Sequence, residues 1–277
     1  MASPTPVKEV DVRNLTDKMH QRALFARGYL LTSHELDAGG EFPFFGNWTR
    51  TKVGAWNLYT HCFTKHYCLN ANGAHIVLIG HAYNPFSRIV DESSLLEDAA
   101  AALEKSEKAF YSVVSEWSGR FVVIVLRDKE MLAVQDCAGM RTLFYGYIHG
   151  VPYLASHAQL LSDVCDLETT PWISDLVESR EYKVGIRFLP GDVSPFSEVK
   201  RLGPNTSLKY CEPTFKVERF YPSASLPYGN NEDDQAARVT KIAELLRASL
   251  EIISEKWNSP AISLTGGLTA KRHLRLA

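Results

Sequence analysis

The hydrophobic pattern is clearest between residues 117 and 148, where three short apolar runs follow one another. Phe121 to Leu126 is wholly apolar, a polar turn follows at Asp128-Lys129-Glu130, and further runs cover Met131 to Val134 and Leu143 to Ile148. Short β-rich runs at hairpin spacing predict an antiparallel meander of three strands. Because the first run has no polar position, both of its faces should be buried, as in a layered sandwich with helices outside.

Similar segments on both sides of this region predict further strands. Residues 37–52 are rich in glycine and aromatic residues and are expected to form a loop, and Asn70-Ala-Asn-Gly73 is a turn signal. Residues 156–162 are expected to begin a helix. The strands predicted here are Gly28 to Ser33, Val53 to Phe63, Ala74 to Ala82 and Val151 to Ala155.

Two longer segments have helical spacing. Ser94-Leu-Leu-Glu97 has the pattern of a capping box and predicts the start of a helix of about six turns. The polar segment Pro222 to Asp234 is a linker and the best domain boundary in the chain. A second helix should follow, with Asn231 near the end of this segment as its N-cap. The apolar stripes are Leu96, Ala99, Leu103, Phe110 and Val114 in the first helix, and Val239, Ile242, Leu246, Leu250 and Ile253 in the second.

Composition excludes several classes of protein. With 277 residues, 45% of them hydrophobic, the chain can bury a substantial core and is not intrinsically disordered. A net charge of -2, from 30 basic and 32 acidic residues, predicts no nucleic-acid partner. No run has the length of a signal peptide core or a membrane span, so we expect a cytoplasmic protein with no membrane partner. The scattered cysteines should be reduced thiols: Cys62, Cys68, Cys137, Cys165 and Cys211.

Two motifs of the central region resemble a known family. Gly119-Arg120-Phe121 and the segment Asp136 to Tyr145 are similar to the glutaminase-type domain of asparagine synthetases, in which a G-x-F strand precedes an R-D-x-x-G-x-[KR]-P-L-[YF]-Y hairpin. Gln135 replaces the usual arginine of this hairpin and Thr142 the usual proline. The resemblance implies an α+β fold for residues 23–222, a four-layer αββα sandwich of the N-terminal-nucleophile (Ntn) hydrolase type, after an N-terminal extension at residues 1–22.

The glutaminase chemistry of that family should be absent. Its nucleophile is the thiol of a Cys-Gly pair at the start of the first strand, and Arg27-Gly28 stands roughly in that place. Ile79-Gly80 matches an Asn-Gly pair that stabilises the oxyanion in the family, and a hydrocarbon side chain cannot donate a hydrogen bond to an oxyanion. No catalytic residue is therefore assigned in this chain.

A glycine motif near residue 265 is similar to the S-G-G-x-D-S pyrophosphate loop of the same enzymes. A short apolar strand, a glycine turn and a helix start would place free backbone N–H groups around an anion. Thr269 replaces the aspartate that supports Mg²⁺, and residues 223–277 would form the linker and the truncated start of an ATP-pyrophosphatase-type α/β domain. The cofactor-binding residues implied by the resemblance are Ser263, Leu264, Thr265, Gly266, Gly267 and Thr269.

The resemblance implies the N-terminal part of an ATP-dependent, amide-bond-forming ligase that does not use glutamine. The full-length parent would bind ATP and Mg²⁺ and act on a small-molecule or peptide carboxylate, whereas this chain alone should bind neither cofactor tightly. A homodimer remains open. The alternative is a non-catalytic pseudo-glutaminase that serves as a binding or scaffold module. A third hypothesis is an amidohydrolase whose nucleophile is freed by cleavage, for instance before Thr32 or Ser33, with loss of about the first thirty residues, although strand interiors are poor cleavage sites.

Other reactive residues favour structural roles. The residues His61, Cys62, His66 and Cys68 are close in sequence, but they lack the C-x₂₋₄-C spacing of zinc sites, so no metal site is predicted. Cys137 is expected to be a small buried side chain and His81 a satisfied polar residue near the former glutamine pocket. Trp48 and Trp56 should close the core or fill that pocket.

Overall fold

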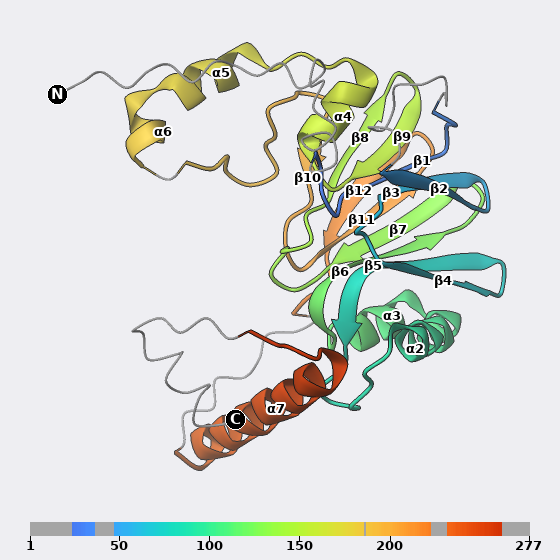
Figure 1. Cartoon of the computed structure of the whole chain (residues 1–277), viewed down its shortest axis with the longest axis vertical. Helices are drawn as coiled ribbons and strands as arrows, with labels where there is room; N and C mark the ends of the chain where they lie inside the picture. Colours follow the sequence, from blue (N-terminus) through green and yellow to red (C-terminus); the bar gives the residue numbers. More distant parts are fainter. Residues whose placement is uncertain (1–23, 37–46, 186, 223–231, 262–277) are drawn as a thin grey trace.

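A computed structural model describes residues 24–36, 47–185, 187–222 and 232–261, and they form two antiparallel sheets between outer helices (Figure 1). The first sheet has the spatial order β10-β8-β9-β1-β3-β2, and the second has the order β12-β11-β7-β6-β5-β4. The strands of the first sheet are β1 (Tyr29–Thr32), β2 (Trp48–Val53), β3 (Trp56–His61), β8 (Phe144–Ile148), β9 (Val151–Ala155) and β10 (Lys200–Arg201). Those of the second are β4 (His66–Ala71), β5 (Ala74–Tyr83), β6 (Ser118–Leu126), β7 (Glu130–Gln135), β11 (Thr206–Cys211) and β12 (Thr214–Arg219).

The helices lie on the outer faces of the two sheets. Helices α2 (Glu92–Lys105) and α3 (Glu107–Val114) cover the second sheet, and α4 (Ala158–Cys165) covers the first. In Figure 1, α5 (Pro171–Glu178) and α6 (Arg180–Val184) project from the side of the first sheet, and the long helix α7 (Glu232–Lys256) lies beyond the second.

The side-chain alternation of β5 explains the layers. Val77 and Ile79 belong to the core between the sheets, whereas Ile76 and Leu78 pack against α2 and α3, and all four are fully buried. Burying one such side chain contributes roughly 1.5–3 kcal/mol, so a strand that is apolar on both faces requires a cover on each side. The predicted α+β, four-layer αββα sandwich is confirmed.

The predicted three-stranded meander is wrong at its third strand. β6 and β7 pair with each other, but β8 pairs with β9 and β10 in the first sheet. The chain leaves the second sheet after Gln135, where the buried carboxylate of Asp136 accepts hydrogen bonds from the backbone N–H groups of Ala138, Met140 and Arg141 at 2.7–3.2 Å. This closed loop carries the chain across to the first sheet.

Several peripheral elements also differ from the prediction. Residues 48–53 form β2 where a loop was expected, and the strands β4 and β12 were not predicted. The capping-box helix begins at Glu92, with Asp91 as its N-cap accepting from the Ser94 N–H at 2.8 Å. It is interrupted at Ser106, whose backbone is extended and whose side chain caps α3. One predicted helix is therefore two.

Helix α7 exists as predicted, but its buried face is different. Val239 and Ile242, two members of the predicted stripe, are 66% and 58% exposed, whereas Ala248 and Ile252 are buried. The C-terminal half of the helix reaches the end of β5 (Figure 1). There, the ammonium group of Lys256 donates to the carbonyl oxygens of Ala82 and Val90 at 2.9 and 2.5 Å.

The same ammonium group forms a largely buried ion pair with Glu92. Lys256 Nζ lies 2.7 Å from Glu92 Oε1, and these side chains are 11% and 7% exposed. His81 Nδ1 lies 3.7 Å from the same oxygen. Burial by itself would raise the pKa of Glu92, but hydrogen bonds from His81 and Lys256 outweigh it and lower this pKa from 4.5 to about 2.

Because the pKa of Glu92 is low in the folded protein, the free energy of unfolding should depend on pH between about 4.5 and 2. A carboxyl group whose folded pKa is depressed stabilises the fold above its ordinary pKa and loses that contribution as the pH falls from about 4.5 towards 2. Glu92→Gln should lower the free energy of unfolding by roughly 3 kcal/mol at neutral pH, and the difference from wild type should shrink below pH 4. Urea unfolding between pH 7 and pH 2.5 measures this, with exposed Glu97→Gln as the control. A difference that stays constant across this range would contradict it.

Close approach of two strands imposes a glycine at position 80. Gly80 has φ +111°, and a Cβ there would lie 2.2 Å from the carbonyl oxygen of Arg120 on β6. We expect Gly80→Ala to destabilise the protein by roughly 3–5 kcal/mol, because positive φ and a backbone clash act together. Gly73→Ala is the control: its φ is +73°, but nothing lies within 4 Å, so it should cost only about 1 kcal/mol. Chemical denaturation of both variants tests this, and equal losses would show that the clash does not matter.

Candidate functional site

The start of β1 is the corner at which the resemblance would place a nucleophile. β1 lies inside the first sheet, paired with β3 on one side and β9 on the other. The residues before it form a turn in which the Gly28 N–H donates to the carbonyl oxygen of Phe25 at 2.7 Å. The Phe25 ring lies on His157, with ring centroids 5.2 Å apart. The residues that precede β1 therefore pack into this corner.

Backbone groups at the start of β1 already have partners. The Gly28 carbonyl accepts hydrogen bonds from the His61 N–H at 3.1 Å and the Thr64 hydroxyl at 2.8 Å. The Tyr29 N–H donates to Ser156 Oγ at 2.9 Å. Arg141 donates from Nη2 to the carbonyl oxygen of Arg27 at 2.7 Å. The resemblance would place the nucleophile near Arg27, and in the structure the carbonyl group of this arginine is held in place by Arg141.

Arg141 is the main charge at this corner. Its guanidinium carbon lies 5.6 Å from the centroid of the Tyr29 ring, a cation–π arrangement. Burial is the main cause that lowers the pKa of Arg141, which nevertheless remains charged at neutral pH. The Tyr29 hydroxyl donates to the carbonyl oxygen of Thr142 at 2.9 Å, and burial raises the pKa of this phenol well above its ordinary value. Neither group is poised to exchange a proton near pH 7.

A serine–histidine pair that the sequence analysis did not single out lies beside Arg141. Ser156 Oγ is 2.8 Å from His157 Nδ1, and burial followed by the positive charge of Arg141 lowers the pKa of His157, so the imidazole is neutral at pH 7. The serine is 4% exposed, and its hydroxyl also contacts both the N–H and the carbonyl group of Tyr29. A hydroxyl held in this way is a structural link between β1 and the end of β9 and not an accessible nucleophile.

No oxyanion donor is available at the expected position on β5. Ile79 is fully buried in the core between the sheets, and the Gly80 N–H donates to the carbonyl oxygen of Lys65 at 2.9 Å. Stabilising an oxyanion requires donors that point at the reacting oxygen and have no other partner. Asn84, a few residues further on, accepts from the N–H groups of Phe86 and Ser87 and so organises a turn.

The histidines and cysteines considered for a metal site are dispersed. His61 and His66 lie on β3 and β4, which belong to different sheets, and Cys62 and Cys68 are exposed. Within the described parts of the chain, no three His, Cys, Asp or Glu side chains form a group that could hold a metal ion.

The structure confirms some of the remaining assignments and overturns one. His81 has a partner in Glu92 and lies edge-on to Trp257, with ring centroids 5.9 Å apart. Trp56 is buried in the core between the sheets. Cys137 was expected to be buried but is exposed, because it follows Asp136 in the loop that leaves the second sheet. Burial of the neighbouring aspartate turns the next side chain outward.

The proposed cofactor-binding residues 263–269 lie outside the described residues, as do the N-terminal extension and most of the linker. Among the helices that are described, none is both long and apolar enough to cross a membrane.

Cleavage before Thr32 would dismantle the first sheet. Thr32 is the last residue of β1, is fully buried, and pairs with Asn57 on β3 and Tyr153 on β9. Removal of the preceding residues would take β1 out of the sheet and leave the pairing edges of β3 and β9 without partners. The geometry therefore disfavours an amidohydrolase activated in this way.

The solved structures that are similar to the chain include the following three. Glutamine phosphoribosylpyrophosphate amidotransferase from B. subtilis, in complex with ADP and GMP, has a TM-score of 0.42 and 12% identity, over 74% of this chain and 46% of its own. The allosteric regulatory enzyme of purine biosynthesis gives the same TM-score, identity and coverage of this chain, over 45% of its own. A glutamine aminotransferase class-II domain protein from Silicibacter pomeroyi has a TM-score of 0.39 and 11% identity, over 70% of this chain and 92% of its own.

The matched part is about half the length of the first two structures. At TM-scores below 0.5, these similarities do not assign the chain to a family. No model of a protein family matches the sequence, and no curated protein matches it significantly.

Ser156 should matter for stability. Ser156→Ala removes the acceptor of the buried Tyr29 N–H and the partner of His157, and an unsatisfied buried donor costs about 1–3 kcal/mol. We expect a loss of about 2 kcal/mol in the free energy of unfolding, measured by urea denaturation. The control is Ser197→Ala, whose exposed hydroxyl donates to the neighbouring Glu198 and whose loss should change stability by less than about 0.5 kcal/mol. Equal effects of the two substitutions on the free energy of unfolding would contradict the structural role of Ser156.

Proposed function

We propose that this chain is a glutaminase-type sandwich that does not hydrolyse glutamine, and that it is the N-terminal part of an ATP-dependent, amide-bond-forming ligase. The observation that carries the proposal is the closed corner at the start of β1. A carbonyl group stands at the nucleophile position, and the Gly80 N–H that would help to bind an oxyanion already donates to Lys65. Such a domain keeps its architecture without the groups that the hydrolysis of glutamine needs.

The attachment of α7 supports a role for the sandwich beside a second domain. The buried Lys256–Glu92 pair and the exposed pair Arg88–Glu251, with a distance of 3.0 Å, tie the helix to the sandwich. The amino-acid pattern of Pro260 to Thr269 predicts an apolar strand, a glycine turn and a helix start, as in a pyrophosphate loop. The sandwich would thus serve as a rigid base for a nucleotide-binding part.

In the proposed reaction, ATP activates a carboxylate. A carboxylate oxygen attacks the α-phosphorus of ATP, the bond to the β,γ-diphosphate breaks, and pyrophosphate leaves with Mg²⁺. An amine then attacks the carbonyl carbon of the acyl adenylate, AMP leaves, and the ammonium proton passes to solvent or to a base. Because glutamine is not hydrolysed, the amine would be supplied by a substrate and not by released ammonia.

A second candidate function is a non-catalytic binding module, and one observation favours it. The arm formed by α5 and α6 projects from the sandwich in Figure 1. Large apolar side chains on this arm and at Phe188 are exposed. Trp172, Val184 and Phe188 are 54%, 76% and 62% exposed. Groups of exposed apolar side chains are typical of surfaces that bind another protein.

The first test is the mass and activity of the polypeptide isolated from its native source. The ligase proposal expects a mass near twice 31.1 kDa and a carboxylate-dependent exchange of labelled pyrophosphate into ATP that needs no glutamine. The 277-residue protein should show neither this exchange nor the release of ammonia from glutamine. Release of ammonia from glutamine by this chain would refute the proposal that it does not hydrolyse glutamine. A native polypeptide of 31.1 kDa without exchange would favour the binding module.

A further inference from the structure

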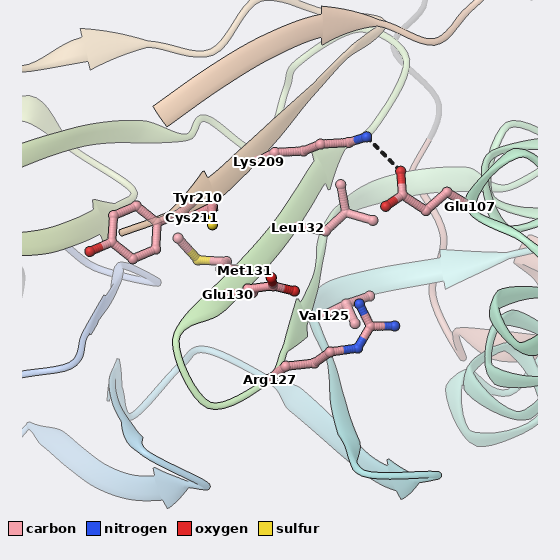
Figure 2. A pocket seen from close by; sticks show the side chains of 9 residues that line it. All are labelled: Glu107, Val125, Arg127, Glu130, Met131, Leu132, Lys209, Tyr210 and Cys211. Carbon is pink, nitrogen blue, oxygen red and sulfur yellow. Dashed lines mark ion pairs between the residues drawn. The ribbon is translucent and has the colours of Figure 1, made fainter. Parts of the chain in front are cut away.

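Two cavities adjoin each other on the helical side of the second sheet, at the end opposite to Gly80. One has a volume of about 190 Å³ and is lined by residues of β6, β7, β11 and the start of α3 (Figure 2). The other has a volume of about 210 Å³ and lies beneath α2, beside the turn that joins β4 and β5. Arg127, just after β6, lines both cavities. We call the two cavities together the Arg127 groove.

The break between α2 and α3 accounts for the position of the groove. The extended backbone at Ser106 ends one helix and starts the next, and the groove is lined by residues on both sides of this break, Glu104 and Glu107. Part of its wall on the sheet is aliphatic, since Val125 and Leu132 line the first cavity, beside Met131, Tyr210 and Cys211, and Ile76 lines the second. The site therefore combines an apolar wall with charged groups around it.

Most of these charged or polar groups already have partners. Lys209 Nζ lies 2.6 Å from Glu107 Oε2, and Figure 2 shows this pair at the edge of the cavity. Lys209 also pairs with Glu218 at 3.2 Å, and the Asn72 amide donates to Glu104. A ligand would have to break strong charge-assisted contacts to use these groups.

Arg127 and Glu130 are different. They face each other across the β6–β7 turn, where the Arg127 N–H donates to the Glu130 carbonyl oxygen at 2.9 Å, and both side chains are exposed. Both line the first cavity, and in Figure 2 the guanidinium group extends past Val125. Within the described part of the chain, neither side chain has an ion-pair partner, although the two carry opposite charges.

We propose that the Arg127 groove binds a small zwitterion with an aliphatic side chain, of the α-amino acid class. The carboxylate of the ligand pairs with Arg127, its ammonium group pairs with Glu130, and its side chain lies on Val125 and Leu132. Guanidinium groups bind carboxylates through two parallel hydrogen bonds, which gives the site its orientation. A cavity of about 190 Å³ has room for one such molecule.

The surrounding charges favour a zwitterion over a simple anion. An anion at Arg127 would also face the carboxylates of Glu104, Glu107 and Glu130, only one of which has Lys209 as a partner. A ligand with an ammonium group beside its carboxylate matches both signs. This site lies at the other end of β5 from the closed corner, so the inference does not depend on the proposed function.

Methyl NMR of the 277-residue protein, with labelled leucine and valine methyl groups, tests the proposal. The probe is L-leucine, and the readout is the shift of the Val125 and Leu132 methyl signals during titration. We expect saturable shifts with a dissociation constant on the order of 1 mM or lower. The matched probes are 4-methylpentanoate, which lacks the amine, and 3-methylbutan-1-amine, which lacks the carboxylate, and both should bind at least about tenfold more weakly.

Single substitutions assign the roles. Arg127→Gln and Glu130→Gln should each weaken L-leucine binding by about tenfold or more. Lys129→Gln is the control on the same turn, because its ammonium group pairs with Glu212 at 3.3 Å outside the groove, and it should leave binding unchanged. Absence of saturable shifts, equal binding of all three probes, or unchanged binding to Arg127→Gln would each overturn the proposal.

Discussion

The structure depends on the exclusion of water from both faces of β5 and β6. These strands are apolar at successive positions, so one half of their side chains points at the first sheet and the other half at α2 and α3. A sheet with two apolar faces cannot lie on the surface of a domain, and the layer on each side follows from this requirement. The ends of the strands are then the places where polar groups can gather.

The sequence alone predicted the strands whose residues form a clear hydrophobic pattern. The apolar runs of β5, β6 and β7 were found because burial on two faces leaves no polar position in the middle of a strand. The short strands β2 and β12 were missed because their side chains are largely exposed and their stability comes from hydrogen bonds with a neighbouring strand. The crossing of β8 to the other sheet was also missed, since it depends on what the Asp136 carboxylate binds. Which sheet β8 joins is therefore set by tertiary contacts that the local sequence pattern does not contain.

The sequence also predicted only part of the candidate site, namely the residue types and not their contacts. Residue types alone showed that Arg27 and Ile79 cannot act as a nucleophile and an oxyanion donor. The bond from Gly80 to Lys65 and the contact of Ser156 with His157 appear only in the structure. The same holds for Arg127 and Glu130, which line one cavity and have no ion-pair partner among the described residues. The two ends of β5 therefore differ: the corner near Gly80 is filled, whereas the end near Arg127 is open.

The attachment of α7 relies on a buried charge and not on a continuous apolar stripe. Taking an ammonium group out of water is unfavourable unless oxygens replace its hydration shell, and Lys256 has three such oxygens. Apolar contacts tolerate sliding along a surface, whereas three directed contacts define one position. This explains why the C-terminal end of the helix has a defined position although Val239 and Ile242, in its N-terminal half, are exposed.

Gly80 has a consequence for how such sequences are interpreted. The sequence resemblance places this residue at a glycine of a catalytic motif, yet its N–H donates to the carbonyl oxygen of Lys65, and its lack of a side chain is required by the carbonyl group of Arg120. Any chain with this pairing of strands needs glycine at that position, whether or not it performs chemistry. A glycine at such a position is therefore evidence of a backbone geometry and not of chemistry, which depends on the side chains around it.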